Sequence, residues 1–356
     1  MSNKNHNLLC NPSPWNHSSS AVWLGSSLTL NRNLEKFKFP GKLDVDRKQQ
    51  VIALLSQDMK GLDATRKTEL FKAEELATLK KEYLVEHYLS MQDFSHAAQG
   101  EAFVVDDLGE FLAVFNLKDH LMIQMIDARE ELEKSWERLT KIEATINRSV
   151  SFAYSPRFGF LTADSTECGT GLVVHIFLHL PGLVYSNKLE EVLEKYKDEG
   201  IEQTGLQGDP EVLIGDILVF HNNYTLGLSE ETIISSMRNL ATKLVVEEKS
   251  ARTTLQHASE HDVAELKDKV SRAYAILLHS YQIEAVEAMH ALSLLKLGLE
   301  LGWVTGITIE QLNKLFFMTR RAHLLCHYGE KISQEDLPHR RAEYIHHELS
   351  GLTLLF

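Results

Sequence analysis

The sequence predicts an α+β protein in which one large, mainly antiparallel sheet flanked by helices is followed by an all-α C-terminal domain. Short apolar runs separated by turn residues between Ala102 and Asp127 predict adjacent antiparallel strands. Stretches with apolar residues at i, i+3 and i+4 predict amphipathic helices on either side of them. From about Ser229 the strand signals stop and helical patterns continue to the end of the chain. A length of 356 residues with 44% hydrophobic residues is enough for two such domains.

Residues 1–20 are rich in Asn, Ser and Pro, and we expect them to form a flexible arm. The elements predicted after the arm are helices at about 44–59 and 67–91, the strands between 102 and 127, a helix at about 128–147, a strand at 172–180, a helix to about 199, and strands near 201–206 and 213–222. The predicted helices of the last part lie at about 229–257, 262–281, 283–301, 308–327 and 338–349. The change from mixed to all-helical pattern places the domain boundary near residue 250, which gives an α+β domain at 21–250 and a helical domain at 251–356.

The chain is acidic, with a formal net charge of -13 from 50 acidic and 37 basic side chains. Such a charge repels phosphate backbones and anionic lipid, so neither nucleic acid nor a membrane surface is an expected partner. The N-terminal stretch is polar and does not resemble a signal peptide. The most apolar stretch, Leu172–Tyr185, is interrupted by His175, His179 and Pro181, so no membrane span is predicted.

The three cysteines are Cys10, Cys168 and Cys326. They are odd in number, widely spaced and lack a CxxC pair, so the sequence suggests neither a disulfide framework nor a zinc site. We therefore expect a reducing, cytoplasmic location.

Residue chemistry alone does not specify a reaction. Gly169–Gly171 is either a short phosphate loop or an ordinary turn before a strand. His346–Glu348 could bind a metal, but adjacent helical histidines point about 100° apart, which favours a solvated face and no protein-bound metal. His175 and His179 lie on one face of a strand and either line a pocket or pack in the core. Cys168 is either a nucleophile or a small buried residue.

Several segments, in order along nearly the whole chain, resemble motifs of the guanidino kinases. The motifs are S-R-x-R-x-x-R-N-L, N-E-E-D-H-x-R-I-Q, L-T-S-C-P-T-N-x-G-T-G-L-R, R-G-x-x-G-E and G-N-x-x-x-x-S-N-x-x-T-L-G, and they match Ser26–Leu34, Asn116–Gln124, Leu161–Val173, the stretch ending in Gly205–Asp209, and Gly215–Gly227. Ile283–Ala285 and Leu297–Gly302 resemble the C-terminal domain of McsB-type protein-arginine kinases. The chain is therefore identified as similar to the ATP:guanidino phosphotransferase (phosphagen kinase) family, nearest its protein-arginine kinases, and its α+β part is expected to be a guanidino-kinase-like domain.

The resemblance implies transfer of the γ-phosphoryl group of Mg-ATP to a guanidinium nitrogen. The family binds the phosphates with a cage of arginines and holds the guanidinium with carboxylates. The cage positions match Ser27, Thr29, Met122, Val173 and Thr204, and none of these residues is cationic. The proposed catalytic carboxylate matches Lys118, a later acid matches Asp209, and a cysteine beside the guanidinium matches Asp164.

The nucleotide-binding positions implied by the resemblance are Ser26, Ser27, Leu28, Thr29, Tyr88 (a histidine in the family), Met122, Val173, Val174, His175, Ile176, Phe177, Thr204, Gly205, Gly208 and Asp209. With the arginines missing, we expect a pseudokinase that acts through protein contacts. Its pocket should be partly filled, with Lys118 paired to Asp209.

Two alternatives stay open at this point. An active protein-arginine kinase would need the missing charge from Lys36, Lys38, Lys118 and Arg32. A phosphoarginine-binding adaptor would use Arg341, which matches one arginine of the R-D-x-x-R-A segment of McsB-type proteins. The resemblance also implies a homodimer formed through the helical domain, and partners such as an McsA-like activator and Clp protease components.

Overall fold

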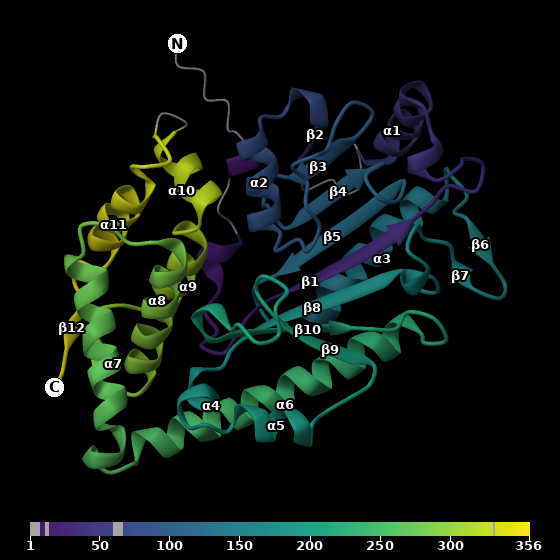
Figure 1. Ribbon diagram of the computed structural model, residues 1–356. Helices are drawn as coiled ribbons and strands as arrows, with labels where there is room; N and C mark the ends of the chain where they lie inside the picture. The colour runs from purple at the N-terminus through teal and green to yellow at the C-terminus, as the bar shows by residue number, and fades with distance from the viewer. Residues whose placement is uncertain (1–7, 11–13, 60–66, 330–331) are drawn as a thin grey trace.

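The computed structural model describes residues 8–10, 14–59, 67–329 and 332–356. It consists of a large twisted sheet with helices and, against one end of this sheet, a group of helices (Figure 1). The predicted order of a sheet-containing part followed by a helical part is confirmed.

The sheet has eight strands in the order β2-β3-β4-β5-β1-β8-β10-β9, and every neighbouring pair is antiparallel. Its strands are β1 (Trp23–Arg32), β2 (Thr68–Lys72), β3 (Ala102–Asp106), β4 (Phe111–Phe115), β5 (Leu121–Asp127), β8 (Leu172–His179), β9 (Ile201–Gly205) and β10 (Ile217–Asn222). Two-residue pairs form outside it between β6 (Tyr154–Ser155) and β7 (Gly159–Phe160), and between β11 (Val304–Thr305) and β12 (Thr353–Leu354). The antiparallel meander predicted between residues 102 and 127 is confirmed.

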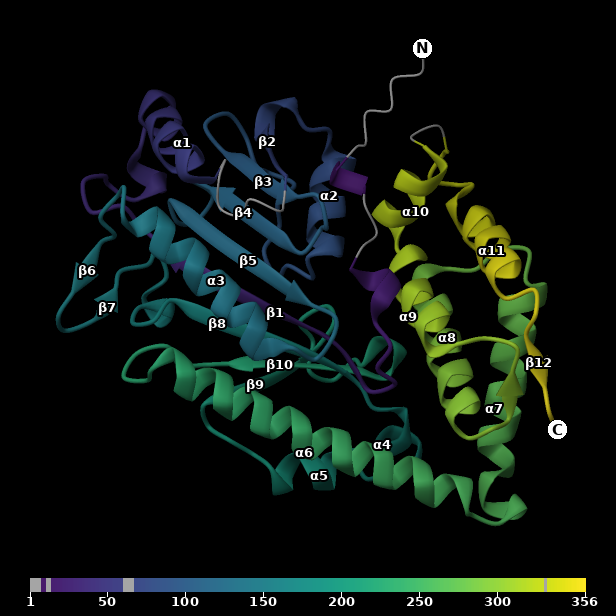
Figure 2. The same ribbon diagram turned by 180° about the vertical axis from the view of Figure 1, so that it is seen from behind.

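One face of the sheet is covered by α1 (Val45–Met59), α3 (Leu132–Asn147) and α6 (Glu230–Gln256), as Figure 2 shows from behind. The alternation of a strand sends Leu28 and Val174 to this face, where they are fully buried among the helices. The short helices α4 (Pro181–Tyr185) and α5 (Leu189–Lys195) lie along α6 at the same side. This layer forms one apolar core of the protein.

The opposite face is covered only in part. Phe177 and Val219 pack there against residues of α8 (Ala285–Glu300) and α9 (Ile309–Met318), and α2 (Thr78–His87) lies nearby. Beyond these helices, the central strands present polar side chains on this face, and that region holds the candidate site.

The helical part contains α7 (Glu260–His279), α8, α9, α10 (Arg321–Tyr328) and α11 (Leu337–Glu348). Side-chain caps begin two of these helices: the Ser259 side chain accepts from the Asp262 amide at the start of α7, and Thr308 forms a capping box with Gln311 at the start of α9. The boundary expected near residue 250 falls inside α6, which packs on the sheet and then leads into α7 (Figure 1).

Three predicted helices differ from the structure. The stretch predicted as a helix at 67–91 contains the edge strand β2 before α2, because Thr68–Lys72 pairs its backbone with β3. The helix predicted at 308–327 is two helices, since Arg320 is extended with ψ of 157°. The helix predicted to reach about 199 is likewise divided, into α4 and α5.

The expectation of a flexible arm at 1–20 is wrong for part of its described residues. Trp15 is 1% exposed and stacks on Phe317 with ring centroids 3.8 Å apart, while its Nε1 donates to the His87 carbonyl at 3.0 Å. Ser18 is fully buried, and its carbonyl accepts from Nδ2 of Asn313 at 2.8 Å. A large apolar ring has more to gain from burial than the polar composition of this segment suggests.

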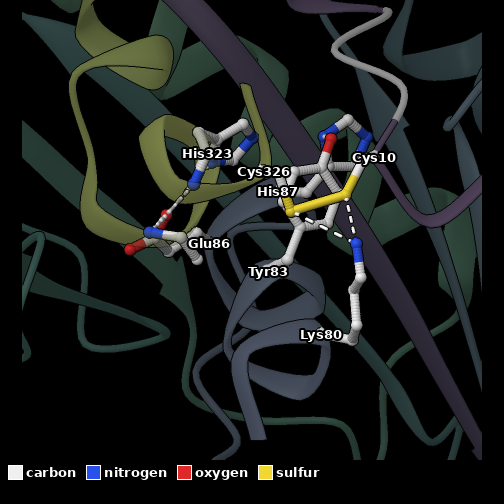
Figure 3. Close-up of a disulfide and its surroundings, with 8 residues drawn as sticks. Cys10, Lys80, Tyr83, Glu86, His87, His323 and Cys326 are labelled. Atoms are coloured by element: carbon white, nitrogen blue, oxygen red, sulfur yellow. Dashed lines mark hydrogen bonds and ion pairs between the residues drawn. A yellow bond between two sulfur atoms is a disulfide. The ribbon is translucent and has the colours of Figure 1, made fainter. Parts of the chain in front are cut away.

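Cys10 and Cys326 form a disulfide, with Cα atoms 6.0 Å apart (Figure 3). This corrects the expectation that the cysteines form no disulfide, which relied on their spacing. The fold brings together two residues that are 316 positions apart in sequence. Cys168 is a free, half-buried thiol. In the part of the chain that the structure describes, no helix has the length and apolar character needed to cross a membrane.

Candidate functional site

The candidate site is a cavity of about 300 Å³ over the polar face of the central strands. Strand pairing sets its floor: Thr29 of β1 lies opposite Gln124 of β5 on one side and Val173 of β8 on the other. His175 of β8 lies beside His221 of β10 in the same way. Because alternate residues of a strand share a face, these side chains all point to the cavity side of the sheet. The segment after α2, from Leu89 to Gln92, forms part of the wall.

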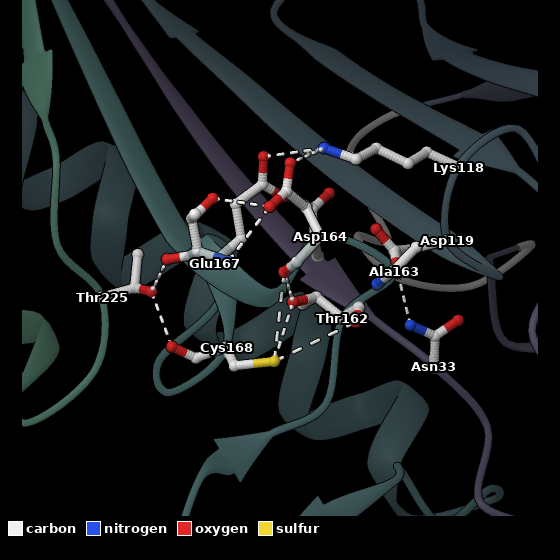
Figure 4. Close-up of polar contacts among 11 residues, drawn as sticks. Asn33, Lys118, Asp119, Thr162, Ala163, Asp164, Glu167, Cys168 and Thr225 are labelled. Atoms are coloured by element: carbon white, nitrogen blue, oxygen red, sulfur yellow. Dashed lines mark hydrogen bonds and ion pairs between the residues drawn. The ribbon is translucent and has the colours of Figure 1, made fainter.

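Lys118 is the one lysine or arginine among the described residues that line this cavity. Its Nζ lies 3.1 Å from Oδ2 of Asp164 and 3.1 Å from Oε1 of Glu167 (Figure 4). Burial disfavours its ammonium group, but the bonds to Glu167 and Asp164 outweigh this and raise the pKa of Lys118. The cation of the cavity is therefore shared by two carboxylates.

A well-bonded turn holds these carboxylates in place. Asp164 caps the short 3-10 helix Ser165–Glu167 by accepting from the Thr166 amide at 3.0 Å. Hydrogen bonds from Thr166, with the contact to Lys118, lower the pKa of Asp164 to about 2. Glu167 also accepts from Nδ2 of Asn31 at 2.8 Å. Both acids are consequently fixed by neighbours other than Lys118.

The same loop is anchored to the rest of the site from two directions. The hydroxyl of Thr225 donates to the carbonyls of Thr166 at 3.0 Å and Cys168 at 2.7 Å. The Asp119 carboxylate accepts from the Ala163 amide at 2.6 Å and from Asn33 (Figure 4). Burial raises the pKa of Asp119 despite these bonds. These hydrogen bonds fix the position of the loop relative to the sheet.

The two histidines of the cavity stack with ring centroids 5.1 Å apart. Burial lowers the pKa of His175 to about 3, and burial also lowers the pKa of His221. Both rings are therefore neutral at pH 7, and neither supplies a positive charge to the cavity. No group of three or more metal-ligating side chains lies together among the described residues.

The structure brings together six of the residues that the family resemblance singled out. Ser27, Thr29, Met122, Val173, His175 and Lys118 share the cavity face or its rim. Met122 and Val173 line the cavity without closing it. Ser27 lies deeper, where its hydroxyl accepts from Nε2 of Gln124.

Other predicted positions lie elsewhere. Leu28, Val174 and Ile176 belong to the core on the opposite face. Ser26 is buried and accepts from Nε1 of Trp23 at 2.9 Å. Phe177 packs under the helical part.

Tyr88 is buried next to the site rather than lining it, since its hydroxyl donates to the Phe111 carbonyl at 2.9 Å. Thr204 is buried on β9 and donates to the Gly205 carbonyl at 3.2 Å. Gly208 lies in the turn that follows Gly205, with a positive φ of 84°. These positions lie outside the lining of the cavity among the described residues.

The expected ion pair between Lys118 and Asp209 is wrong. Among the described residues, Lys118 pairs with Asp164 and Glu167, whereas the Asp209 side chain accepts from the Glu211 amide in its own turn. Asp209 belongs to the loop after β9, and the carboxylates of the turn before β8 reach Lys118 instead. The sequence analysis did not single out Glu167. A signal was present: Glu167 occupies a motif position that is Asn in the family, and Lys118 occupies one that is an acid, so the two charge changes could have indicated a pair.

Two arginines considered for charged roles are structural. Nε of Arg32 pairs with Glu143 at 3.0 Å, and its guanidinium lies 3.6 Å from the centre of the Phe160 ring. Arg341 is 2% exposed and donates to the carbonyls of Thr319 and Ile283, both at 2.7 Å. The Arg341 guanidinium is therefore enclosed, which weighs against its use as a phosphoarginine receptor.

Of the two interpretations of Gly169–Gly171, the structure shows the turn before β8. Its Thr170 amide donates to the Thr225 carbonyl at 3.1 Å, and Gly171 accepts from the Asn31 amide at 2.9 Å. A side chain at Gly169 would lie 2.3 Å from the Thr225 carbonyl, and φ is 117° there. Glycine is thus explained by close backbone packing.

Solved structures of guanidino kinases have this fold. Lombricine kinase superposes with a TM-score of 0.57 at 16% identity, covering 68% of this chain and 69% of that protein. The duplicated taurocyamine kinase of Schistosoma mansoni, in a form with transition-state analogue components, gives a TM-score of 0.58 at 20% identity, covering 70% of this chain and 37% of that one. The large antiparallel sheet with flanking helices is thus the guanidino-kinase fold.

The sequence comparisons identify the family. Residues 50–251 match the ATP:guanido phosphotransferase C-terminal catalytic domain, and residues 262–354 match the protein-arginine kinase McsB C-terminal domain. The protein-arginine kinase of Chlamydia pneumoniae is 33% identical over 346 residues, 94% of each chain. That of Halothermothrix orenii is 30% identical over 329 residues, covering 91% of this chain and 92% of that protein. The chain belongs to the ATP:guanido phosphotransferase family, as its motifs predicted.

Proposed function

We propose that this chain is a protein-arginine-kinase-like pseudokinase, which keeps the family fold and acts through protein contacts. The observation that carries this proposal is the state of Lys118. The only lysine or arginine among the described cavity-lining residues is already bonded to two carboxylates, so these residues offer the cavity no uncompensated positive charge.

The residues present do not fit Mg-ATP. A triphosphate needs several cationic or N–H donors directed at its oxygens, and loss of one preorganised donor typically costs about 3–4 kcal/mol. The family's arginine positions are the uncharged Ser27, Thr29, Met122, Val173 and Thr204. Even with strong non-additivity, such losses remove roughly 10 kcal/mol or more, which is most of a typical enzymatic acceleration.

The surroundings of Lys118 also disfavour the acceptor arginine. A guanidinium bound here would lie beside a lysine at a position where the family motif has a carboxylate, and the two positive charges would repel each other. Asp164 and Glu167 cannot replace the missing acid freely, because both already bond Lys118, Asp164 also accepts from Thr166, and Glu167 also accepts from Asn31 of β1.

An active kinase with an atypical phosphate site is the second candidate, favoured by the persistence of a cavity of about 300 Å³ at this place. It would have to draw charge from Lys36 and Lys38, which are exposed on the segment after β1. Arg32 is bonded to Glu143 and is not available to it.

We further propose a homodimer formed through the helical part, and protein partners of the type that serve protein-arginine kinases, namely an McsA-like activator and Clp protease components, in the cytoplasm. Family membership supports these proposals. Size-exclusion chromatography with light scattering tests the dimer, and co-purification with each candidate partner tests the contacts.

The decisive experiment uses purified protein with Mg-ATP and an arginine-rich acceptor. Phosphoarginine is detected by mass spectrometry, and nucleotide binding is titrated in parallel, with the Chlamydia pneumoniae protein-arginine kinase as the positive control. We expect no transfer above background. Stoichiometric phosphorylation would refute the pseudokinase proposal and establish the second candidate.

A further inference from the structure

The Cys10–Cys326 disulfide joins two distant parts of the protein. Cys10 ends the short 3-10 helix Leu8–Cys10, and Cys326 lies in α10 of the helical part. Both residues are half-buried. Lys80 of α2 completes the arrangement from a third element (Figure 3).

Lys80 directs its ammonium group at both sulfur atoms. Nζ lies 2.8 Å from Sγ of Cys10 and 3.6 Å from Sγ of Cys326. A cation at this distance stabilises a thiolate, which is both the nucleophile and the leaving group of thiol–disulfide exchange.

We propose that Cys10 and Cys326 form a redox site that exchanges with small thiols and disulfides, and that its oxidised form fastens the N-terminal segment across the junction of α2 and α10. This inference does not depend on whether the chain transfers phosphate. Lys80 is a positioning residue that favours the thiolate in both directions of the exchange.

The exchange balances with a dithiol as the reductant. One thiolate of the dithiol attacks a sulfur of the disulfide, and the other protein sulfur leaves as a thiolate beside Lys80. The second thiol of the reductant then attacks the reductant sulfur of this mixed disulfide and displaces the remaining protein sulfur as a thiolate, so the reductant becomes a disulfide and the protein gains two thiols, with two electrons and two protons transferred. Oxidised glutathione reverses the step and leaves as two molecules of reduced glutathione.

The bond fastens a segment that packs on both parts of the molecule. Leu9 is 3% exposed and belongs to the same buried cluster as Leu84 of α2 and Phe103 of β3. The 3-10 helix that carries it contacts α2, β3 and α10. In the oxidised protein this segment therefore covers the junction between the sheet part and the helical part.

The junction leads directly to the candidate site. The Glu86 carboxylate of α2 accepts from the first backbone amides of α10, at 3.0 Å from Ala322 and 3.2 Å from His323. Immediately after α2 the chain forms the cavity wall at Leu89–Gln92. The disulfide therefore lies at the junction from which α2 leads to the cavity wall.

The test uses the full chain equilibrated across a range of reduced and oxidised glutathione ratios, followed by acid quench, alkylation and mass spectrometry. We expect reversible two-electron conversion of Cys10 and Cys326, while Cys168 stays alkylatable throughout. Cys168 is the internal control because it forms no disulfide in the structure and its sulfur contacts oxygen atoms of Thr162 and Asp164. The variants Cys10→Ser and Cys326→Ser should each abolish the conversion, and Cys168→Ser should leave it unchanged.

A second measurement tests Lys80. In Lys80→Met, alkylation of the reduced pair near neutral pH should slow by about 5–10-fold, because the thiolate loses its cation, and Cys168 should react at its original rate. Limited proteolysis should cut near Cys10 faster in the reduced than in the oxidised wild type. Failure of the wild type to form the disulfide with oxidised glutathione would overturn the proposal. An unchanged alkylation rate in Lys80→Met would overturn the role of the lysine.

Discussion

Releasing Lys118 from its carboxylates should create a weak phosphate site. The double variant Asp164→Asn, Glu167→Gln keeps side-chain shape and the capping bond but removes both charges that neutralise the ammonium. A unit charge 4 Å from a phosphate oxygen is worth about 4 kcal/mol at an effective dielectric constant of about 20. Since the Lys118 side chain is 37% exposed, solvent and salt reduce this to about 1 kcal/mol. We therefore expect ATP and inorganic pyrophosphate to bind about 5-fold more tightly than to the wild type.

The assay is isothermal titration at low and moderate salt, with the gain shrinking as salt rises. The matched control is Glu260→Gln, Glu265→Gln, which removes two carboxylates from the exposed ion pairs of α7 and so changes the net charge equally. If the control gains as much affinity as the double variant, the effect is one of net charge alone. If neither variant gains, the two carboxylates are not what keeps phosphate out, and the reasoning behind the pseudokinase proposal is refuted.

Three further outcomes concern stability. Trp15→Ala should lower the free energy of unfolding by about 3–5 kcal/mol in urea titrations, because the buried indole is lost, whereas Tyr154→Ala, at a residue 60% exposed, should change it by less than about 0.5 kcal/mol. Arg341→Ala should lower the free energy of unfolding by about 2–5 kcal/mol in thermal and urea titrations, because two buried carbonyls lose their donors. If the variant is fully stable but no longer binds phosphoarginine, the result would support a receptor role instead. Burial lowers the pKa of His87 to about 3, so the unfolded chain takes up this proton first and stability falls as pH drops below about 6.5, by about 2 kcal/mol at pH 5. His87→Gln should remove this contribution of about 2 kcal/mol from the loss between pH 7 and pH 5 and leave that of other buried histidines such as His175. His347→Gln, whose side chain is 86% exposed, should leave the loss unchanged, and urea midpoints at both pH values measure the difference.

The meander of β3, β4 and β5 was predictable because each strand is a short apolar run between turn residues. The central strand β1 was not predicted from its pattern, although all ten of its residues are buried. The pattern of β1 includes the polar residues Ser26, Ser27, Thr29 and Asn31. Such residues can be buried only when they form hydrogen bonds, as Ser27 does with Gln124. Propensity rules describe local sequence and cannot predict partners that are distant in the chain.

Some of the positions matched to the family line the cavity, but the interactions within it were not predicted. Thr29, Met122 and Val173 are among its lining residues. Spacing along the chain could not show which acid reaches Lys118, because that depends on how the loop before β8 folds over β1. The disulfide was not predicted because its two cysteines are 316 positions apart, and such a contact leaves no local signal in the sequence.

The substitutions around Lys118 make most physical sense as one exchange of charge. A lysine stands where the family motif has an acid, while Asp164 and Glu167 stand where it has Cys and Asn, and the three side chains meet within 3.1 Å. Without Lys118 the two acids would keep their hydrogen bonds to Thr166 and Asn31 but would lack a counter-charge, and Lys118 without the acids would be an unpaired cation. Together they form a bonded group that also fixes the turn before β8. The three charged side chains thus have a structural role at this face, because their contacts hold the turn against β1 and balance one another's charge.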